Sequence, residues 1–126
     1  MPLTPDLPPG PHLVVGYSDT EVRLRDRTLT TSALITPTAI SDWPVTAVEA
    51  LDVASLDPVL ALGASVVLLA TGSRQRFPDR TVLARARAAG IGLEVMDVGA
   101  ACRTYNVLVA EDRAVALALI LPRPAP

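Results

Sequence analysis

The chain has 126 residues, half of them hydrophobic, which is the length of one ordinary domain with enough apolar material for a sizeable core. Its net charge of −2 and its lack of lysine provide no electrostatic footprint for nucleic acid, no Schiff-base amine and no Walker-type phosphate lysine. A single cysteine excludes an internal disulfide, and with a single histidine it leaves too few ligands for an ordinary zinc site, so we expect neither a metal nor a cofactor.

The two ends of the chain are rich in proline. Residues 1–11 are predicted to be a flexible Pro-rich arm, residues 12–121 a single domain, and residues 122–126 a Pro-rich tail. The start lacks the basic segment of a signal peptide, and no apolar run reaches the ~18 residues that a membrane-spanning helix needs. We therefore expect a soluble cytoplasmic protein without membrane insertion.

The first part of the domain is predicted to be a β meander. Residues 12–18 and 20–25 are β-type runs joined at Asp19, a residue typical of tight turns. Apolar and polar residues alternate strictly in 20–25, which predicts a strand with one buried and one solvated face. Residues 27–37 are predicted to form the third strand of the meander.

The middle of the chain is predicted to hold an extended turn and a short helix. Trp43 precedes a proline and therefore avoids the α region, and we expect its ring to fill the core beneath this turn. Residues 55–63 are predicted to be helical, with Ser55 as the N-cap and Gly63 at the C-terminal end.

The remainder follows a β-α-β-α-β pattern. The continuous apolar run at residues 65–71 is typical of a strand buried on both faces. Residues 91–97 are predicted to be a second buried strand, and residues 114–121 a last strand that is apolar enough to be central. Residues 79–90 predict a helix that Asp79 caps and Gly90 ends, and residues 98–112 predict a second helix. Together with the meander, these elements predict an α/β domain with a mixed sheet and helices packed on it.

Polar residues follow strands 65–71 and 91–96, which one helix connects. Such a crossover makes the strands parallel, so their carboxyl ends meet at one rim, where open α/β sheets bind ligands. The residues expected at this rim are Thr71, Gly72, Arg76, Asp97 and Thr104. One interpretation is a small anion held by Arg76 and a helix N-terminus. The other is structural, with Gly72 in a turn that needs a positive φ and Asp97 as the N-cap of the following helix.

The helix at 98–111 carries the most informative residues. Projection at about 100° per residue places its apolar side chains on one arc, made of Val98, Ala101, Cys102, Tyr105, Leu108 and Val109. Cys102 is thus expected to be a buried, unreactive thiol, and no catalytic residue is assigned. Tyr105 is expected to bury its ring and to hydrogen-bond through its hydroxyl, and Asn106 to tie a neighbouring loop. Arg103 points away from the core and is the first residue to consider for a partner.

The segment GIGLEVMDVGAACRTYNVLVAEDRAVALALILP, together with VVLLATGSRQRFP and SALITPTAISDW upstream, closely resembles the Mth938-like family of small single-domain proteins. Many members have no known function, and eukaryotic members include an assembly factor of mitochondrial complex I (NADH:ubiquinone oxidoreductase) and an adipogenesis-associated protein. The resemblance spans residues 12–121 and implies a three-layer α/β/β fold and no established catalysis. Val98 and Ala70 depart from the threonine and glycine of many relatives.

Two functions from different classes are predicted. The first is a non-catalytic protein-interaction or assembly-factor-like module whose partner is another protein, with a contact surface that includes the Trp43 loop and the helix near Arg103. The alternative is a small-molecule binding protein or enzyme that uses the rim. A homodimer through an edge strand of the meander is a further expectation.

Overall fold

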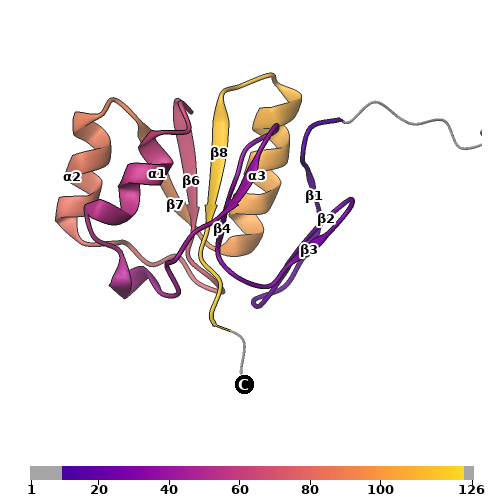
Figure 1. The fold of residues 1–126 in the computed structure, drawn as a ribbon, viewed down its shortest axis with the longest axis horizontal. Helices are drawn as coiled ribbons and strands as arrows, with labels where there is room; N and C mark the ends of the chain where they lie inside the picture. Colours follow the sequence, from indigo (N-terminus) through magenta and orange to yellow (C-terminus); the bar gives the residue numbers. More distant parts are fainter. Residues whose placement is uncertain (1–9, 124–126) are drawn as a thin grey trace, which may run out of the picture.

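A five-stranded mixed sheet forms the centre of the computed structural model, which describes residues 10–123 (Figure 1). Its strands lie in the order β5-β4-β8-β6-β7 and comprise β4 (Ala33–Ile35), β5 (Ile40–Asp42), β6 (Val66–Ala70), β7 (Gly92–Met96) and β8 (Val115–Leu119). β6 pairs in parallel with β7 and β8, and β4 pairs antiparallel with β5 and β8. The predicted mixed α/β architecture is therefore confirmed. The predicted arm and tail lie largely outside the described residues.

A second sheet contains the predicted meander. It is antiparallel, with the order β1-β2-β3, and comprises β1 (Val14–Tyr17), β2 (Val22–Leu24) and β3 (Thr28–Leu29). The register of β1 on β2 shifts between Val14 and Gly16, so Val15 is an extra residue that bends β1.

The prediction of one strand over residues 27–37 is wrong, because this segment divides between the two sheets. Its first part is β3 of the small sheet, and its second part is β4 of the large sheet. Ser32 lies at the crossing point, where its hydroxyl accepts from the N–H of Leu121 at 2.8 Å and donates to the carbonyl of Leu121 at 3.2 Å. These two bonds fix the start of β4 beside the chain that follows β8.

Helices cover both faces of the large sheet (Figure 1). One face carries η1 (Val48–Ala50), η2 (Ala54–Leu56), α1 (Asp57–Leu60) and α2 (Arg80–Ala88). The other face carries α3 (Val98–Ala110) together with the small sheet. The fold thus has three layers, with the large sheet in the middle.

Two apolar cores lie on either side of the large sheet. In β6, Val67 and Leu69 pack toward the α2 side, whereas Leu68 and Ala70 pack toward α3 and the small sheet. Burial on both faces explains the continuous apolar runs of β6 and β8. The prediction of full burial is wrong for β7, because this strand lies at the edge of the sheet and Glu94 is exposed.

The helix ends follow local chemistry in most places. The carboxylate of Asp79 accepts from the N–H of Thr81 at 2.9 Å and caps α2, and Gly90 has a φ of 75° after the helix, as predicted. The predicted helix at 55–63 is shorter, and Ser55 is not its N-cap. Ser55 lies inside η2, where its N–H and hydroxyl both donate to the carboxylate of Asp52 at 2.8 Å.

Candidate functional site

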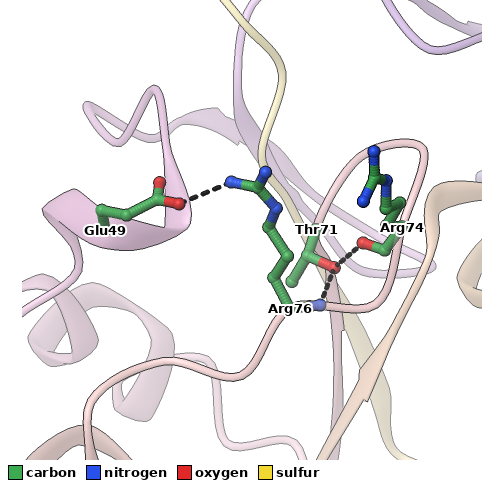
Figure 2. A network of polar contacts seen from close by, with 4 residues as sticks. All are labelled: Glu49, Thr71, Arg74 and Arg76. Atoms are coloured by element: carbon green, nitrogen blue, oxygen red, sulfur yellow. Dashed lines mark hydrogen bonds and ion pairs between the residues drawn. The ribbon is translucent and has the colours of Figure 1, made fainter.

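The predicted rim lies at the carboxyl ends of β6 and β7, which are parallel and end opposite each other. Thr71 organises the loop that follows β6 (Figure 2). Its hydroxyl donates to the carbonyl of Arg74 at 2.6 Å, lies 3.1 Å from the carbonyl of Met96, and accepts from the N–H of Arg76 at 3.0 Å. Gly72 has a φ of 95°, a conformation that favours glycine. These residues give the rim loop, residues 71–76, its closed shape.

Arg76 forms an exposed ion pair across the rim. Its guanidinium lies 2.6 Å from the carboxylate of Glu49 in η1, and the two side chains are 55% and 63% exposed (Figure 2). An exposed pair of this kind stabilises a fold by about 0–1 kcal/mol. Its larger effect is to offset the charge that was expected to attract an anion to Arg76.

Asp97 is the N-cap of α3. Its carboxylate accepts from the N–H of Ala100 at 2.9 Å, and the N–H of Val98 donates to the carbonyl of Gly72 at 2.7 Å. These bonds use donors of the first turn of α3 that could otherwise have bound an anion. The structural interpretation of Asp97 therefore matches the geometry.

A groove of about 350 Å³ opens beside the rim loop. Its walls come from the β1–β2 turn, the η1 region, the rim loop and the chain after β8, through residues Asp19, Thr20, Thr46–Glu49, Thr71–Arg74, Arg76, Ile120 and Pro122. The structure thus brings Thr71, Gly72 and Arg76 together in one groove. Asp97 and the half-buried Thr104 are not among its lining residues.

Arg103 and Asn106 lie elsewhere, in a smaller groove of about 120 Å³ between β1 and α3. The side-chain amide of Asn106 donates to the carbonyl of Val14 at 2.8 Å and accepts from the N–H of Val14 at 3.0 Å. Asn106 thus makes with Val14 the same pair of hydrogen bonds that a residue of a neighbouring strand would make. The hydroxyl of Tyr105 donates to the carbonyl of His12 at 2.7 Å. Tyr105 acts as predicted, whereas Asn106 holds the start of strand β1 and not the loop that was expected.

Arg103 contacts a residue that the sequence did not single out. Its guanidinium donates to the hydroxyl of Tyr17, at the end of β1, at 2.5 Å. A Cβ atom on Gly99 would lie 3.0 Å from the Tyr17 ring and hydroxyl and 3.1 Å from the Arg103 guanidinium, so a larger residue here would require these side chains to shift by a few tenths of an ångström. The one signal in the sequence was a glycine in the first turn of a helix, where it is otherwise unfavourable.

The thiol of Cys102 is 1% exposed and faces the core. Burial raises its pKa to about 11, although the neighbouring Arg103 acts in the opposite direction. Burial also raises the pKa of the Tyr105 hydroxyl. Because the thiolate is the reactive form, Cys102 is inert near neutral pH.

Within residues 10–123, no three His, Cys, Asp or Glu side chains are grouped as a metal ion would require. None of the helices in this range is both long and apolar enough to cross a membrane.

The chain is similar in sequence or structure to both eukaryotic and bacterial proteins. Proteins of Xenopus tropicalis and Danio rerio, 34% and 32% identical, are named NADH dehydrogenase (ubiquinone) 1 alpha subcomplex assembly factor 3. The alignments cover 73% and 87% of this chain but 51% and 64% of those proteins, so the chain spans half to two thirds of their length.

Solved structures match the whole fold. A Xanthomonas campestris protein superposes with a TM-score of 0.85 at 39% identity, covering 100% of this chain and 96% of that one. A Bordetella pertussis protein described as a Mth938-like domain gives 0.78 at 26% identity, with 95% and 92% covered. A Bartonella henselae protein described as an outer membrane protein gives 0.76 at 26% identity, with 91% and 98% covered.

The profile of one protein family, described as a protein of unknown function (DUF498/DUF598), matches residues 14–120. This range contains both sheets, all three α-helices and, except for Pro122, the residues that line both grooves. The chain therefore belongs to the DUF498/DUF598 family, and its fold is that of the Mth938-like domain.

Proposed function

We propose that this protein is a non-catalytic protein-interaction module with an assembly-factor-like role. The proposal rests on one observation: the side chains that could take part in a reaction are buried or make hydrogen bonds that hold the fold together. Thr71 closes the rim loop, Asp97 caps α3 and Asn106 holds β1. The single thiol, Cys102, is buried and protonated near neutral pH.

The exposed surface offers contacts of the kind that protein partners use. Phe77 is 65% exposed in the segment between β6 and α2, Val15 is 61% exposed on β1, and Val107 is 55% exposed on α3. Aromatic and arginine side chains are enriched in protein–protein interfaces, and Arg76 and Arg103 lie beside these apolar groups. The assembly-factor names of the curated relatives also favour a protein as the partner.

A deletion strain tests the proposed role. We expect loss of the gene to lower the amount of assembled NADH dehydrogenase on native gels, and we expect Cys102→Ala to restore it as fully as the natural chain does. A tagged chain produced at its natural level is expected to cross-link reproducibly to specific proteins that an unrelated tagged domain of equal size does not capture. Failure of Cys102→Ala at normal abundance, or the absence of any reproducible cross-link, would contradict the proposal.

The rim groove supports a second candidate function, the binding of a small anionic molecule. Arg74 lines this groove and makes no ion pair within 4.0 Å among the described residues, and Thr20, Thr46 and Ser73 line the same groove. A panel of small carboxylates and phosphates is expected to raise the melting temperature of the natural chain but not that of Arg74→Ala. Equal shifts in both proteins, or none, would reject this candidate.

Location and self-association are part of the same proposal. We place the protein in the cytoplasm, although a similar protein from Bartonella henselae is described as an outer membrane protein. Fractionation of the native cell distinguishes the two locations. Self-association through a meander edge strand stays a prediction, and light scattering of the purified chain measures it.

A further inference from the structure

The surface where β1 lies against α3 carries exposed apolar side chains on both elements and the guanidinium of Arg103. Val15 and Tyr17 on β1 are 61% and 40% exposed, and Val107 on α3 is 55% exposed. Arg103 precedes Val107 by four residues, so both side chains lie on the outer face of the helix. We call these four residues, Val15, Tyr17, Arg103 and Val107, the β1–α3 patch.

The patch is held in place from beneath. The two hydrogen bonds between Asn106 and Val14 fix the strand on the helix, and the guanidinium of Arg103 is oriented by its bond to the Tyr17 hydroxyl. Gly99 lets the Tyr17 ring lie close to α3. A surface that is already ordered loses little conformational entropy when a partner binds.

The charge of Arg103 has no counterpart on this surface. The ion pairs within residues 10–123 involve Arg23, Arg27 and Arg76, and no carboxylate lies within 4.0 Å of Arg103. The residues that line the adjoining groove include no acidic side chain. A guanidinium has five N–H donors, so Arg103 can bind a carboxylate and keep its bond to Tyr17.

We propose, on the basis of the interaction function proposed above, that the β1–α3 patch docks a segment of a partner protein that carries an Asp or Glu flanked by apolar residues. The carboxylate pairs with Arg103, and the apolar side chains cover Val15, Tyr17 and Val107. A second copy related by two-fold symmetry fits poorly, because it would bring like charges together without a carboxylate between them. A nucleic acid fits poorly as well, because the patch has one cation and the chain has a net charge of −2.

A library of random 16-residue peptides displayed on phage tests this chemistry with a defined probe. We expect the natural chain to enrich peptides that contain Asp or Glu between apolar residues. A synthetic peptide of the enriched sequence is expected to bind Arg103→Glu and Val107→Glu at least tenfold more weakly than the natural chain. The matched control is Arg80→Glu, the same charge change at an exposed position of α2, which should bind normally. Replacing the peptide carboxylate by arginine should restore binding to Arg103→Glu.

Urea unfolding of each variant checks that the fold is retained, and Val107→Glu keeps the test valid if Arg103→Glu does not fold. The proposed patch would be overturned if the enriched peptides contained no acidic residue, if no peptide were enriched, or if both variants bound the peptide as tightly as the natural chain does. Binding that is lost in Phe77→Ala instead would also overturn it, but would leave the proposed interaction function standing. The absence of cross-linked partners in the cell is the separate result that rejects that function.

Discussion

Replacing Asn106 with alanine tests the contact that joins the helix layer to the small sheet. In the natural chain, the amide of Asn106 makes two hydrogen bonds to the backbone of Val14, at 2.8 and 3.0 Å, across 92 residues of sequence. Asn106→Ala removes both bonds and leaves the N–H and carbonyl of Val14 without these partners. The site is partly buried, so water replaces the lost bonds only incompletely.

The expected loss follows from ordinary hydrogen-bond energies. Each bond contributes about 1 kcal/mol net, so the free energy of unfolding should fall by about 2 kcal/mol. An unfolding entropy of about 2.1 cal/mol/K per residue over this chain converts that loss to a decrease of about 8 °C in the melting temperature. Urea denaturation followed by the fluorescence of Trp43, which is buried on the opposite side of the sheet, measures the global change. Hydrogen exchange at Val14 measures the local one.

Val107→Ala is the matched control, because it shortens the next side chain on the same helix at an exposed position. Its unfolding free energy should stay within about 0.5 kcal/mol of the natural value. An Asn106→Ala protein as stable as this control, with Val14 still protected from exchange, would refute the argument that Asn106 holds β1 in place.

Three further predictions concern other contacts. The folded-state pKa of Cys102, about 11, lies above that of an unfolded thiol, so the folded protein keeps its proton at higher pH. The unfolding free energy should therefore fall as the pH rises from about 8.5 to about 11. Cys102→Ala should reduce this fall, and an unchanged slope in urea titrations would contradict it. Gly99→Ala should be less favourable in the natural chain, where the new Cβ lies 3.0 Å from Tyr17, than in Tyr17→Ala, where only a helix-propensity gain of about 1 kcal/mol acts. An equal change in both backgrounds would show that the close contact has no effect. Thr71→Val should cost about 2 kcal/mol in thermal unfolding and speed hydrogen exchange at the N–H of Arg76, whereas unchanged exchange there would show that the hydroxyl does not close the loop.

Features with a local cause could be predicted from the sequence. Asp79 and Asp97 cap their helices because a carboxylate reaches amides two or three residues ahead, and this spacing is visible in the chain. The buried arc of α3, including Cys102 and Tyr105, follows from the helical period alone. Continuous apolar runs identified β6 and the central strand β8 for the same kind of reason.

Features that depend on distant partners could not be predicted in this way. The run from 27 to 37 has uniform β character, and the pairing of Ser32 with Leu121 decides where it changes sheets. Arg76 reaches Glu49 across 27 residues, and Arg103 reaches Tyr17 across 86. Periodicity shows which face a side chain occupies but not which remote element lies opposite it.

The position of β8 in the large sheet has a consequence for how the protein is made. β8 is the last strand along the chain, yet it lies between β4 and β6 and is the only strand that joins β4–β5 to β6–β7 within residues 10–123. A nascent chain that contains every strand except β8 therefore has no strand to pair β4–β5 with β6–β7. The apolar faces of these strands cannot be fully covered until β8 is in place. Such a nascent chain is prone to aggregate until β8 is added. Translation thus completes the sheet at its centre rather than at its edge, and the folding of both cores is delayed until residue 119 has left the ribosome.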